Sequence, residues 1–216
     1  MEEIIKVENA VKVYKETRAL NGVSVTFEKG KIHGIIGRNG SGKTVLLRSI
    51  CGLTKLTSGV VYVRGEQIGK DVDIPTKIGA IIEYPGFIPE LSGYGNLKYL
   101  ADINGVVKKE KIIETLRLVG LEEASGKKVG KYSLGMKQRL GIAQAIMEDP
   151  EILILDEPTN GLDKDGVKEF RKLMLKLKDE GRTIVIASHN AEDIGYLCEH
   201  IIELDKGEVV ENDECC

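Results

Sequence analysis

Residues 37–44 have the residue types and the spacing that are needed to hold a polyphosphate. They fit the pattern Gly-x4-Gly-Lys-[Ser/Thr] at every fixed position. Glycine lets backbone N–H groups approach phosphate oxygens closely, and the start of the following helix would face the same oxygens. The lysine would bring a charge to the β/γ-phosphates, and the last hydroxyl could ligate Mg²⁺. The predicted nucleotide-binding loop comprises Gly37, Arg38, Asn39, Gly40, Ser41, Gly42, Lys43 and Thr44.

A pair of acidic residues follows the apolar run 152–155, which has the composition of a parallel strand buried on both faces. An acid at the carboxyl end of such a strand, beside a phosphate loop, is placed to hold Mg²⁺. We therefore expect Asp156 to bind the metal ion, through water, and Glu157 to orient or deprotonate an attacking water. Two acids after a strand could instead mark an ordinary helix start, but the phosphate loop favours the catalytic interpretation.

The elements that must position these groups can be predicted from periodicity. Alternating apolar residues predict antiparallel strands at 4–8 and 23–27, and apolar runs predict core strands around 32–36, 78–82 and 183–187. Helical periodicity predicts helices at 45–50, 109–119 and 166–180, and residues 201–210 predict a closing hairpin. Between Tyr94 and Gly141 only helices are expected. We predict a single α/β domain, with a core at 1–84 and 146–216 and a helical subdomain inserted at about 85–145.

Composition and charge exclude several classes of function. The net charge is −3 and there is no basic tail, which argues against a nucleic-acid partner. No apolar run approaches the roughly 18 residues that span a bilayer, and the acidic start of the chain is not a signal peptide. A membrane role would therefore require a partner.

Four cysteines in a chain of this length do not suggest a disulfide scaffold. Cys51 and Cys198 are expected to be core thiols, and His33 and His200 to be structural. Cys215 and Cys216 suggest a frayed tail, with a lipidated tail resembling a prenylation signal as the alternative.

Three further motifs carry a resemblance to a family. The run Asp156-Glu157-Pro158-Thr159-Asn160-Gly161-Leu162-Asp163 resembles the Walker B motif and D-loop of ATP-binding cassette (ABC) ATPases, and Tyr132-Ser133-Leu134-Gly135-Met136-Lys137-Gln138-Arg139 resembles their signature motif. Ser188-His189 resembles the switch histidine of the family, and Tyr14 stands where the family has an aromatic residue that stacks on adenine. The motifs occur in the family's order over essentially the whole chain.

The resemblance implies a P-loop (RecA-like) core with an antiparallel β subdomain and an inserted helical signature subdomain. It also implies ATP and Mg²⁺ as cofactors and an ATP-dependent head-to-tail homodimer that encloses two nucleotides. The loop, Asp156, Glu157 and His189 would come from one subunit, whereas Ser133 and Gly135 of the other would reach the γ-phosphate. Taken alone, Ser133 would be interpreted as an ordinary helix cap.

Two positions depart from the common family pattern. The signature reads Tyr-Ser-Leu-Gly-Met in place of Leu-Ser-Gly-Gly-Gln, but it keeps the serine and the second glycine. Glu83 stands where most members have a glutamine, and with the following residues 84–87 it resembles the bacitracin and lantibiotic self-protection branch of ABC transporters. The resemblance implies that Glu83 lies near Mg²⁺ and the attacking water, as a metal ligand and catalytic group. The alternative is a solvated strand end. The irregular apolar stretch 84–89 is the expected docking surface for a partner.

The leading interpretation is the ATPase subunit of an ABC transporter that exports peptide antibiotics or gives immunity to them. It would be cytoplasmic and would reach the inner face of the cell membrane through a transmembrane permease. The alternative is a soluble ABC ATPase of iron–sulfur cluster assembly. Translation factors of the family carry two cassettes, whereas this chain has one phosphate loop. A DNA-repair member would have a long coiled coil between Lys43 and Asp156, where no heptads occur.

Overall fold

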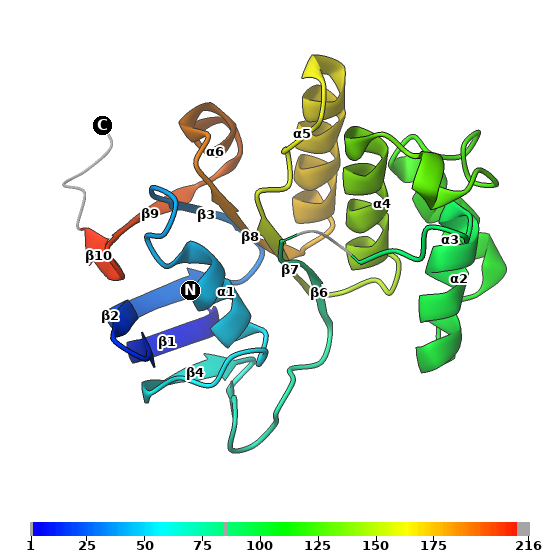
Figure 1. The fold of residues 1–216 in the computed structure, drawn as a ribbon. Helices are drawn as coiled ribbons and strands as arrows, with labels where there is room; N and C mark the ends of the chain where they lie inside the picture. The colour runs from blue at the N-terminus through cyan, green and yellow to red at the C-terminus, as the bar shows by residue number, and fades with distance from the viewer. Residues whose placement is uncertain (1, 84–85, 211–216) are drawn as a thin grey trace.

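The computed structural model describes residues 2–83 and 86–210. The N-terminal part of the chain builds most of a four-stranded antiparallel sheet (Figure 1). In spatial order its strands are β2 (Thr17–Glu28), β1 (Glu3–Tyr14), β4 (Ser58–Val63) and β5 (Glu66–Gln67). β1 and β2 are longer than the predicted strands 4–8 and 23–27. Shifts in their pairing register let the ladder continue past the point where the apolar alternation is broken.

A second sheet of six strands lies beside the first and forms the core of the molecule. Its strands in spatial order are β10 (Glu208–Val210), β9 (His200–Asp205), β3 (Ile32–Ile36), β8 (Thr183–Ser188), β7 (Ile152–Asp156) and β6 (Ile78–Ile81). All neighbours pair in parallel except β9 and β10, which form the predicted closing hairpin. β8 lies between β3 and β7, so the carboxyl ends of three core strands meet at one edge.

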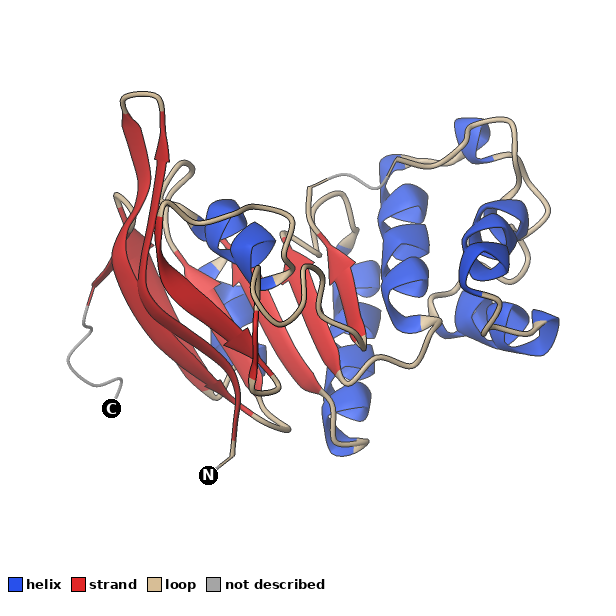
Figure 2. Cartoon of the chain, turned by 90° about the horizontal axis from the view of Figure 1, so that it is seen from below, coloured by secondary structure: helices blue, strands red, loops and turns tan. Residues whose placement is uncertain are grey.

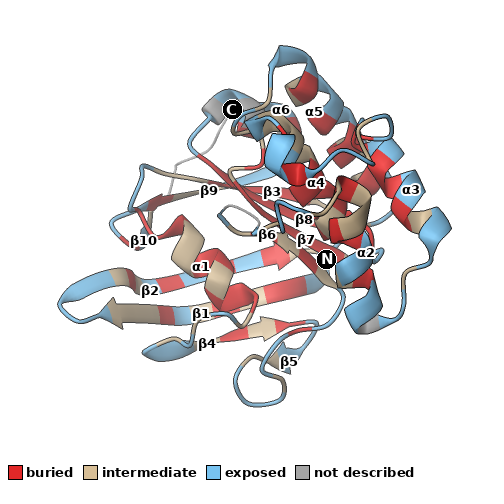
Figure 3. Cartoon of the chain, turned by 45° about the vertical axis from the view of Figure 1, so that its right-hand side comes forward, coloured by how far each residue is buried: buried red, intermediate tan, exposed pale blue. Residues whose placement is uncertain are grey.

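Hydrophobic residues on the two faces of this sheet belong to separate cores. In β7, Leu153 and Leu155 pack into one core, whereas Ile152 and Ile154 pack into the other. This alternation is the two-residue period of a strand. Buried residues dominate the central strands β3, β7 and β8 in Figure 3. Because both faces are covered, every residue of β7 and β8 is buried, as the continuous apolar runs predict.

Three helices belong to the core: α1 (Lys43–Ile50), α5 (Lys164–Asp179) and α6 (Ala191–Leu197). α1 packs between the two sheets and contacts β1, β2, β4 and β7. α5 begins two residues before the predicted helix because the Asp163 side chain caps it, accepting a hydrogen bond from Gly166 N at 2.8 Å. α5 ends just before Gly181, whose φ of 88° suits glycine.

The remaining helices form a block at one side of the sheet (Figure 2). They are α2 (Gly93–Asn104), α3 (Lys109–Leu118), the 3₁₀ turn η1 (Val129–Lys131) and α4 (Leu134–Ile146). All of them lie in sequence between β6 and β7, where only helices are predicted. The proposed subdomain limits remain a prediction. Residues 84–85 of the expected docking stretch, and Cys215 and Cys216, lie outside the described residues.

The remaining cysteines and histidines sit in or near the cores. Cys51 is buried and Cys198 is partly buried, and burial raises the pKa of each thiol to about 12. His33 is buried, and its Nε2 shares a hydrogen bond of 2.9 Å with the Glu28 carbonyl oxygen. His200 is exposed and its ring stacks on that of His33. Within residues 2–83 and 86–210, no helix combines the length and the apolar character needed to cross a bilayer.

Candidate nucleotide-binding and hydrolysis site

The phosphate loop joins the end of β3 to the start of α1. Gly42 precedes the helix with a φ of 108°, and a Cβ at this position would lie 2.6 Å from the Ala19 carbonyl oxygen. Only glycine therefore fits there, for its conformation and for its packing. The Lys43 ammonium folds back over the loop and donates to the carbonyl oxygens of Gly37 at 2.6 Å and Arg38 at 3.1 Å. The lysine thus holds the loop in shape around the start of α1.

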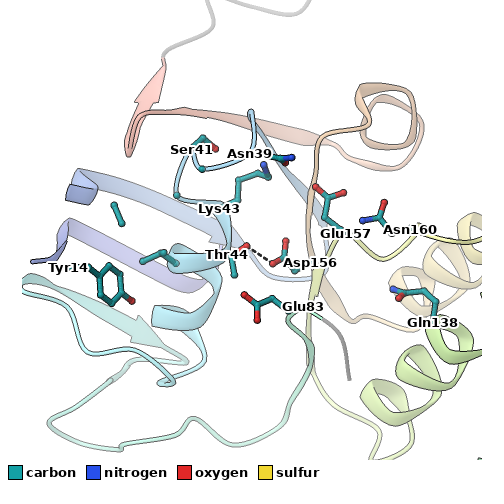
Figure 4. Close-up of a pocket in the computed structure, with 14 residues that line it drawn as sticks. Tyr14, Asn39, Ser41, Lys43, Thr44, Glu83, Gln138, Asp156, Glu157 and Asn160 are labelled. Carbon is teal, nitrogen blue, oxygen red and sulfur yellow. Dashed lines mark hydrogen bonds between the residues drawn. The ribbon is translucent and has the colours of Figure 1, made fainter. Parts of the chain in front are cut away.

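A cavity of about 710 Å³ opens in front of this loop, which is within the usual range for ligand sites. The Ser41 hydroxyl faces it, is buried and has no hydrogen-bond partner within the part of the chain that the structure describes. Buried polar groups are normally paired, so this orphan hydroxyl fits a site that is completed by a polar ligand. The cavity (Figure 4) is lined by Tyr14, Ala19, Asn39, Gly40, Ser41, Gly42, Lys43, Thr44, Val45, Glu83, Gln138, Asp156, Glu157 and Asn160.

Two oxygen ligands meet on the cavity wall where α1 faces β7. The Thr44 hydroxyl donates to Asp156 Oδ2 at 2.7 Å, shown as the dashed line in Figure 4. Burial raises the pKa of the Asp156 carboxyl, and the charges of Glu157 and Glu83 act in the same direction. The Thr44 hydrogen bond and Lys43 act against this rise. A hydroxyl and a carboxylate are the hard ligands that Mg²⁺ prefers, so the donor set fits the metal ion.

Glu157 and His189 form a pair at the carboxyl ends of β7 and β8. The Glu157 carboxylate accepts from His189 N at 3.0 Å and from the Ser188 hydroxyl at 3.2 Å, and His189 Nδ1 lies 2.8 Å from Glu157 Oε2. Glu157 has a φ of 48°, which is unfavourable for a residue with a side chain. Its own N–H donates to the Ala187 carbonyl at 2.8 Å. The strained backbone thus directs the carboxylate toward the histidine and the cavity.

Glu83 lies on the cavity wall below the Thr44–Asp156 pair in Figure 4. Its backbone has a φ of 61°, and its Oε2 lies 2.8 Å from Nη2 of Arg48 on α1. The Glu83 side chain is 58% exposed, and its carboxylate has a specific cationic partner. Its roles as a metal ligand or as a solvated strand end both remain predictions. Arg48 was not predicted as a site residue. Its spacing of four residues from Thr44, which puts both on one face of α1, was the available signal.

Tyr14 is exposed at the end of β1 and lines the opposite wall of the cavity. The Lys12 ammonium lies 4.7 Å from the centroid of its ring, within cation–π range. The same ammonium donates to the Lys55 carbonyl oxygen at 2.6 Å. Lys12 therefore holds the Tyr14 ring beside the cavity, in a position that suits stacking on a nucleotide base.

Ser133 and Gly135 lie outside the cavity of their own chain. The Ser133 hydroxyl caps α4 by accepting from Met136 N at 3.2 Å, as its interpretation as a helix cap predicts. A Cβ on Gly135 would lie 2.8 Å from the Gly161 carbonyl oxygen, so the signature turn packs directly on residues 158–163. His189, Gly37 and Arg38 likewise do not line the cavity; the loop carbonyls of the last two bond Lys43 instead.

Sequence reasoning missed four cavity residues: Ala19, Val45, Gln138 and Asn160. Gln138 is buried on α4, and its side-chain amide donates to the Pro158 carbonyl oxygen at 3.0 Å. A polar residue on the buried face of a helix was the available signal, since such a group needs a specific partner. Nothing local in the sequence indicates Ala19, which reaches the cavity through the pairing of β1 with β2.

A phosphate loop, a buried carboxylate hydrogen-bonded to the loop threonine and a glutamate–histidine pair at the edge of a parallel sheet are the arrangement expected of a nucleoside-triphosphate hydrolase. The chain belongs to the ABC transporter family, whose sequence profile matches residues 20–160. The predicted resemblance to ABC ATPases and the predicted fold class are thus confirmed.

Relatives cover nearly all of the chain. An uncharacterized ABC transporter ATP-binding protein, YybJ of Bacillus subtilis (strain 168), is 46% identical over 94% of this chain and 94% of its own length. The bacitracin transport ATP-binding protein BcrA of Bacillus licheniformis is 44% identical over 98% of this chain and 70% of its own. The lantibiotic transport ATP-binding protein SrtF of Streptococcus pyogenes is 39% identical over 96% and 89%.

Solved structures of ABC cassettes have the same fold. The dimeric cassette MJ0796 superposes with a TM-score of 0.88 at 30% identity, over 96% of this chain and 97% of the other. A dimer of MJ0796 bound to ADP and Pi, in a post-hydrolysis state, also gives a TM-score of 0.88, at 29% identity over 97% and 98%.

Proposed function

We propose that this chain is the ATP-binding and ATP-hydrolysing subunit of a transporter that exports peptide antibiotics or gives immunity to them. The observation that carries the ATPase half of the proposal is one cavity whose wall holds Thr44 paired with Asp156 and, beside them, Glu157, which contacts His189 behind the wall. The first pair has metal-binding chemistry, and the second has the chemistry to activate water.

Each residue has a separate task in this proposal. The backbone of residues 37–42 and the Lys43 ammonium bind the phosphates, and Tyr14 stacks on the base. The Glu157 carboxylate holds the attacking water and takes its proton, while His189 keeps that carboxylate oriented through the contact at 2.8 Å. Thr44 and Asp156 would hold Mg²⁺, which when bound supplies positive charge to the phosphate oxygens.

A second copy of the chain would complete the site. Ser133 and Gly135 stand at the start of α4 and do not line the nucleotide cavity of their own chain, although a helix N-terminus is suited to an anion. The dimeric state of the cassette MJ0796 supports a head-to-tail homodimer in which they face the partner's nucleotide. ATP would then act as part of the interface, and its hydrolysis would loosen the dimer.

A patch of apolar side chains on the helical block supports a partner in the membrane. Ile103 near the end of α2 is 68% exposed and Val106 just beyond it is 73% exposed, with Tyr99 one turn earlier also exposed. A groove of about 430 Å³ runs between this patch and the edge strand β6. We propose that a transmembrane permease docks here and at the stretch 84–89, which would hold the chain at the inner face of the cell membrane.

The substrate class rests on the relatives and on Glu83. BcrA is described as a bacitracin transport protein and SrtF as a lantibiotic transport protein. No comparable support exists among these relatives for the alternative in iron–sulfur cluster assembly. Glu83, which departs from the usual glutamine, lines the proposed hydrolysis site. We therefore assign the transporter to peptide antibiotics.

Two measurements test the proposal separately. The purified chain should release phosphate from ATP only when Mg²⁺ is present; a chain that does not bind or hydrolyse ATP would refute the ATPase. A sensitive host that carries the chain with its neighbouring permease gene should gain resistance to bacitracin or to a lantibiotic. Ile103→Asp should abolish this resistance and leave the ATPase activity of the isolated chain intact. Resistance that is unchanged by this variant would remove the docking patch from the proposal.

A further inference from the structure

The ion pair between Arg48 and Glu83 joins two segments that the hydrolysis site brings together. Arg48 lies in the last turn of α1, the helix whose first residues, Lys43 and Thr44, form the phosphate and metal end of the cavity. Glu83 follows β6 and faces the cavity from the other side. The Nη2 and Oε2 atoms are 2.8 Å apart. This ion pair thus connects α1 to the segment that follows β6.

Stability does not account for this pair. The Arg48 side chain is 37% exposed and that of Glu83 is 58% exposed, and ion pairs in such positions contribute little to folding. The backbone of Glu83 is also in a left-handed conformation that costs free energy for a glutamate. Strained residues of this kind gather at functional sites, and here the strain and the ion pair occur at the same residue.

The charges around the cavity indicate what the Arg48–Glu83 pair does. Three carboxylates, those of Glu83, Asp156 and Glu157, line one cavity that must also accept the negative phosphates of ATP. The Lys43 ammonium lines the cavity but is engaged with two loop carbonyls, those of Gly37 and Arg38. Arg48 is the cation that contacts Glu83, and its charge offsets the charge of that carboxylate.

We propose that Arg48 is a positioning residue for Glu83: it holds the carboxylate beside α1 and limits the negative charge that Glu83 presents to the metal end of the site. This inference rests on the proposed function. Without Arg48, the freed carboxylate would repel nucleotide that carries no metal ion, whereas bound Mg²⁺ would offset the added charge. Removing Arg48 should therefore make nucleotide binding depend more strongly on Mg²⁺, and only as long as residue 83 is acidic.

A double-mutant cycle tests the inference by binding rather than by activity. The β,γ-imido analogue of ATP is titrated calorimetrically into wild type, Arg48→Met, Glu83→Gln and the double variant, once with Mg²⁺ and once with EDTA. We expect Arg48→Met to raise the ratio of the dissociation constant in EDTA to that in Mg²⁺ about twofold to fivefold, which lies within the range for one exposed ion pair. In the Glu83→Gln background the same substitution should change this ratio little. Arg48→Lys, which keeps the charge, should restore most of the wild-type ratio.

The control variant removes an arginine from an ion pair elsewhere in the chain. Arg117→Met removes an arginine whose ion pair with Glu122 lies on the helical block, away from the cavity, and should leave the ratio unchanged. If Arg48→Met has the same effect in the Glu83→Gln background as in the wild-type background, Arg48 acts on the nucleotide directly and the inference is wrong. A wild type that binds no nucleotide would refute the proposed function instead. Thermal melting of each variant verifies folding; should Arg48→Met fail to fold, Arg48→Gln takes its place in the cycle.

Discussion

The helices α1 and α4 both begin beside glycines, but their N-termini differ in capping and in surroundings. At α1, Gly42 provides no side-chain cap, and the first turn faces a cavity to which β1, β2 and β7 of the same chain contribute lining residues. At α4, the Ser133 hydroxyl already caps the helix, and the exposed Leu134 does not line that cavity. Both ends have the dipole and N–H groups that favour an anion.

The difference between the two helix N-termini indicates which groups act within one chain and which would need a second copy of the chain. The α1 end has a lysine, a threonine and an aspartate supplied by its own fold, so in our proposal it binds a nucleotide within one chain. The α4 end is packed on residues 158–163 and does not line the cavity of its own chain. Substitutions at the first end should therefore act on the monomer, and substitutions at the second should act only when two copies meet.

The largest effect is expected for Glu157→Gln. The amide keeps the shape of the side chain but cannot take a proton, so hydrolysis should fall about 10²- to 10⁴-fold while ATP still binds. Trapped ATP would then hold two chains together, and size-exclusion chromatography with MgATP should show a dimer. A monomer at high protein concentration would count against a site completed by the second copy.

Lys43→Ala should remove most of the affinity for MgATP. The substitution deletes the ammonium that organises the loop and that would face the β/γ-phosphates, a charged contact of about 1.5–3 kcal/mol. Calorimetric titration of the monomer measures it. Affinity equal to that of wild type would contradict the assignment of this end as self-sufficient.

Tyr14→Ala should weaken ATP binding by about 1–3 kcal/mol, the range for stacking of a base on an aromatic ring. Tyr14→Phe is the matched control, since it keeps the ring and should bind nearly as tightly as wild type. Because the tyrosine belongs to the α1 end, the loss should be the same at low and high protein concentration. Equal affinities of the alanine variant and wild type would leave Tyr14 with a packing role only.

The smallest effect in one chain is expected for Ser133→Ala. Loss of the cap on α4 should lower stability by about 1 kcal/mol and leave ATP binding by the monomer unchanged. The matched control is Ser92→Ala, because Ser92 caps α2 in the same way, accepting from Gly95 N at 3.0 Å. Both variants should melt alike, but only Ser133→Ala should also lower ATPase activity at concentrations that support a dimer. Identical ATPase rates for the two would reduce Ser133 to a helix cap.

The parts of the site that depend on local conformation could be predicted from the sequence. The phosphate loop is specified by residues adjacent in the chain, since Gly42 must adopt a left-handed conformation just before α1. Asp156 was found because a run of apolar residues ends where a buried strand must end. Ser133 was found as a site residue only through the resemblance of residues 132–139 to the ABC signature motif, since alone it indicates a helix cap. The roles assigned to these residues in hydrolysis remain predictions.

Which distant residues meet depends on the tertiary fold. The insertion of β8 between β3 and β7 brings His189 to Glu157, and no local pattern encodes that strand order. The contacts of Gln138 with Pro158 and of Arg48 with Glu83 likewise depend on tertiary packing, in which α4 packs against β6 and α1 against β7. Local sequence sets backbone conformation within a few residues, whereas these contacts follow from the burial of apolar faces by segments far apart in the chain.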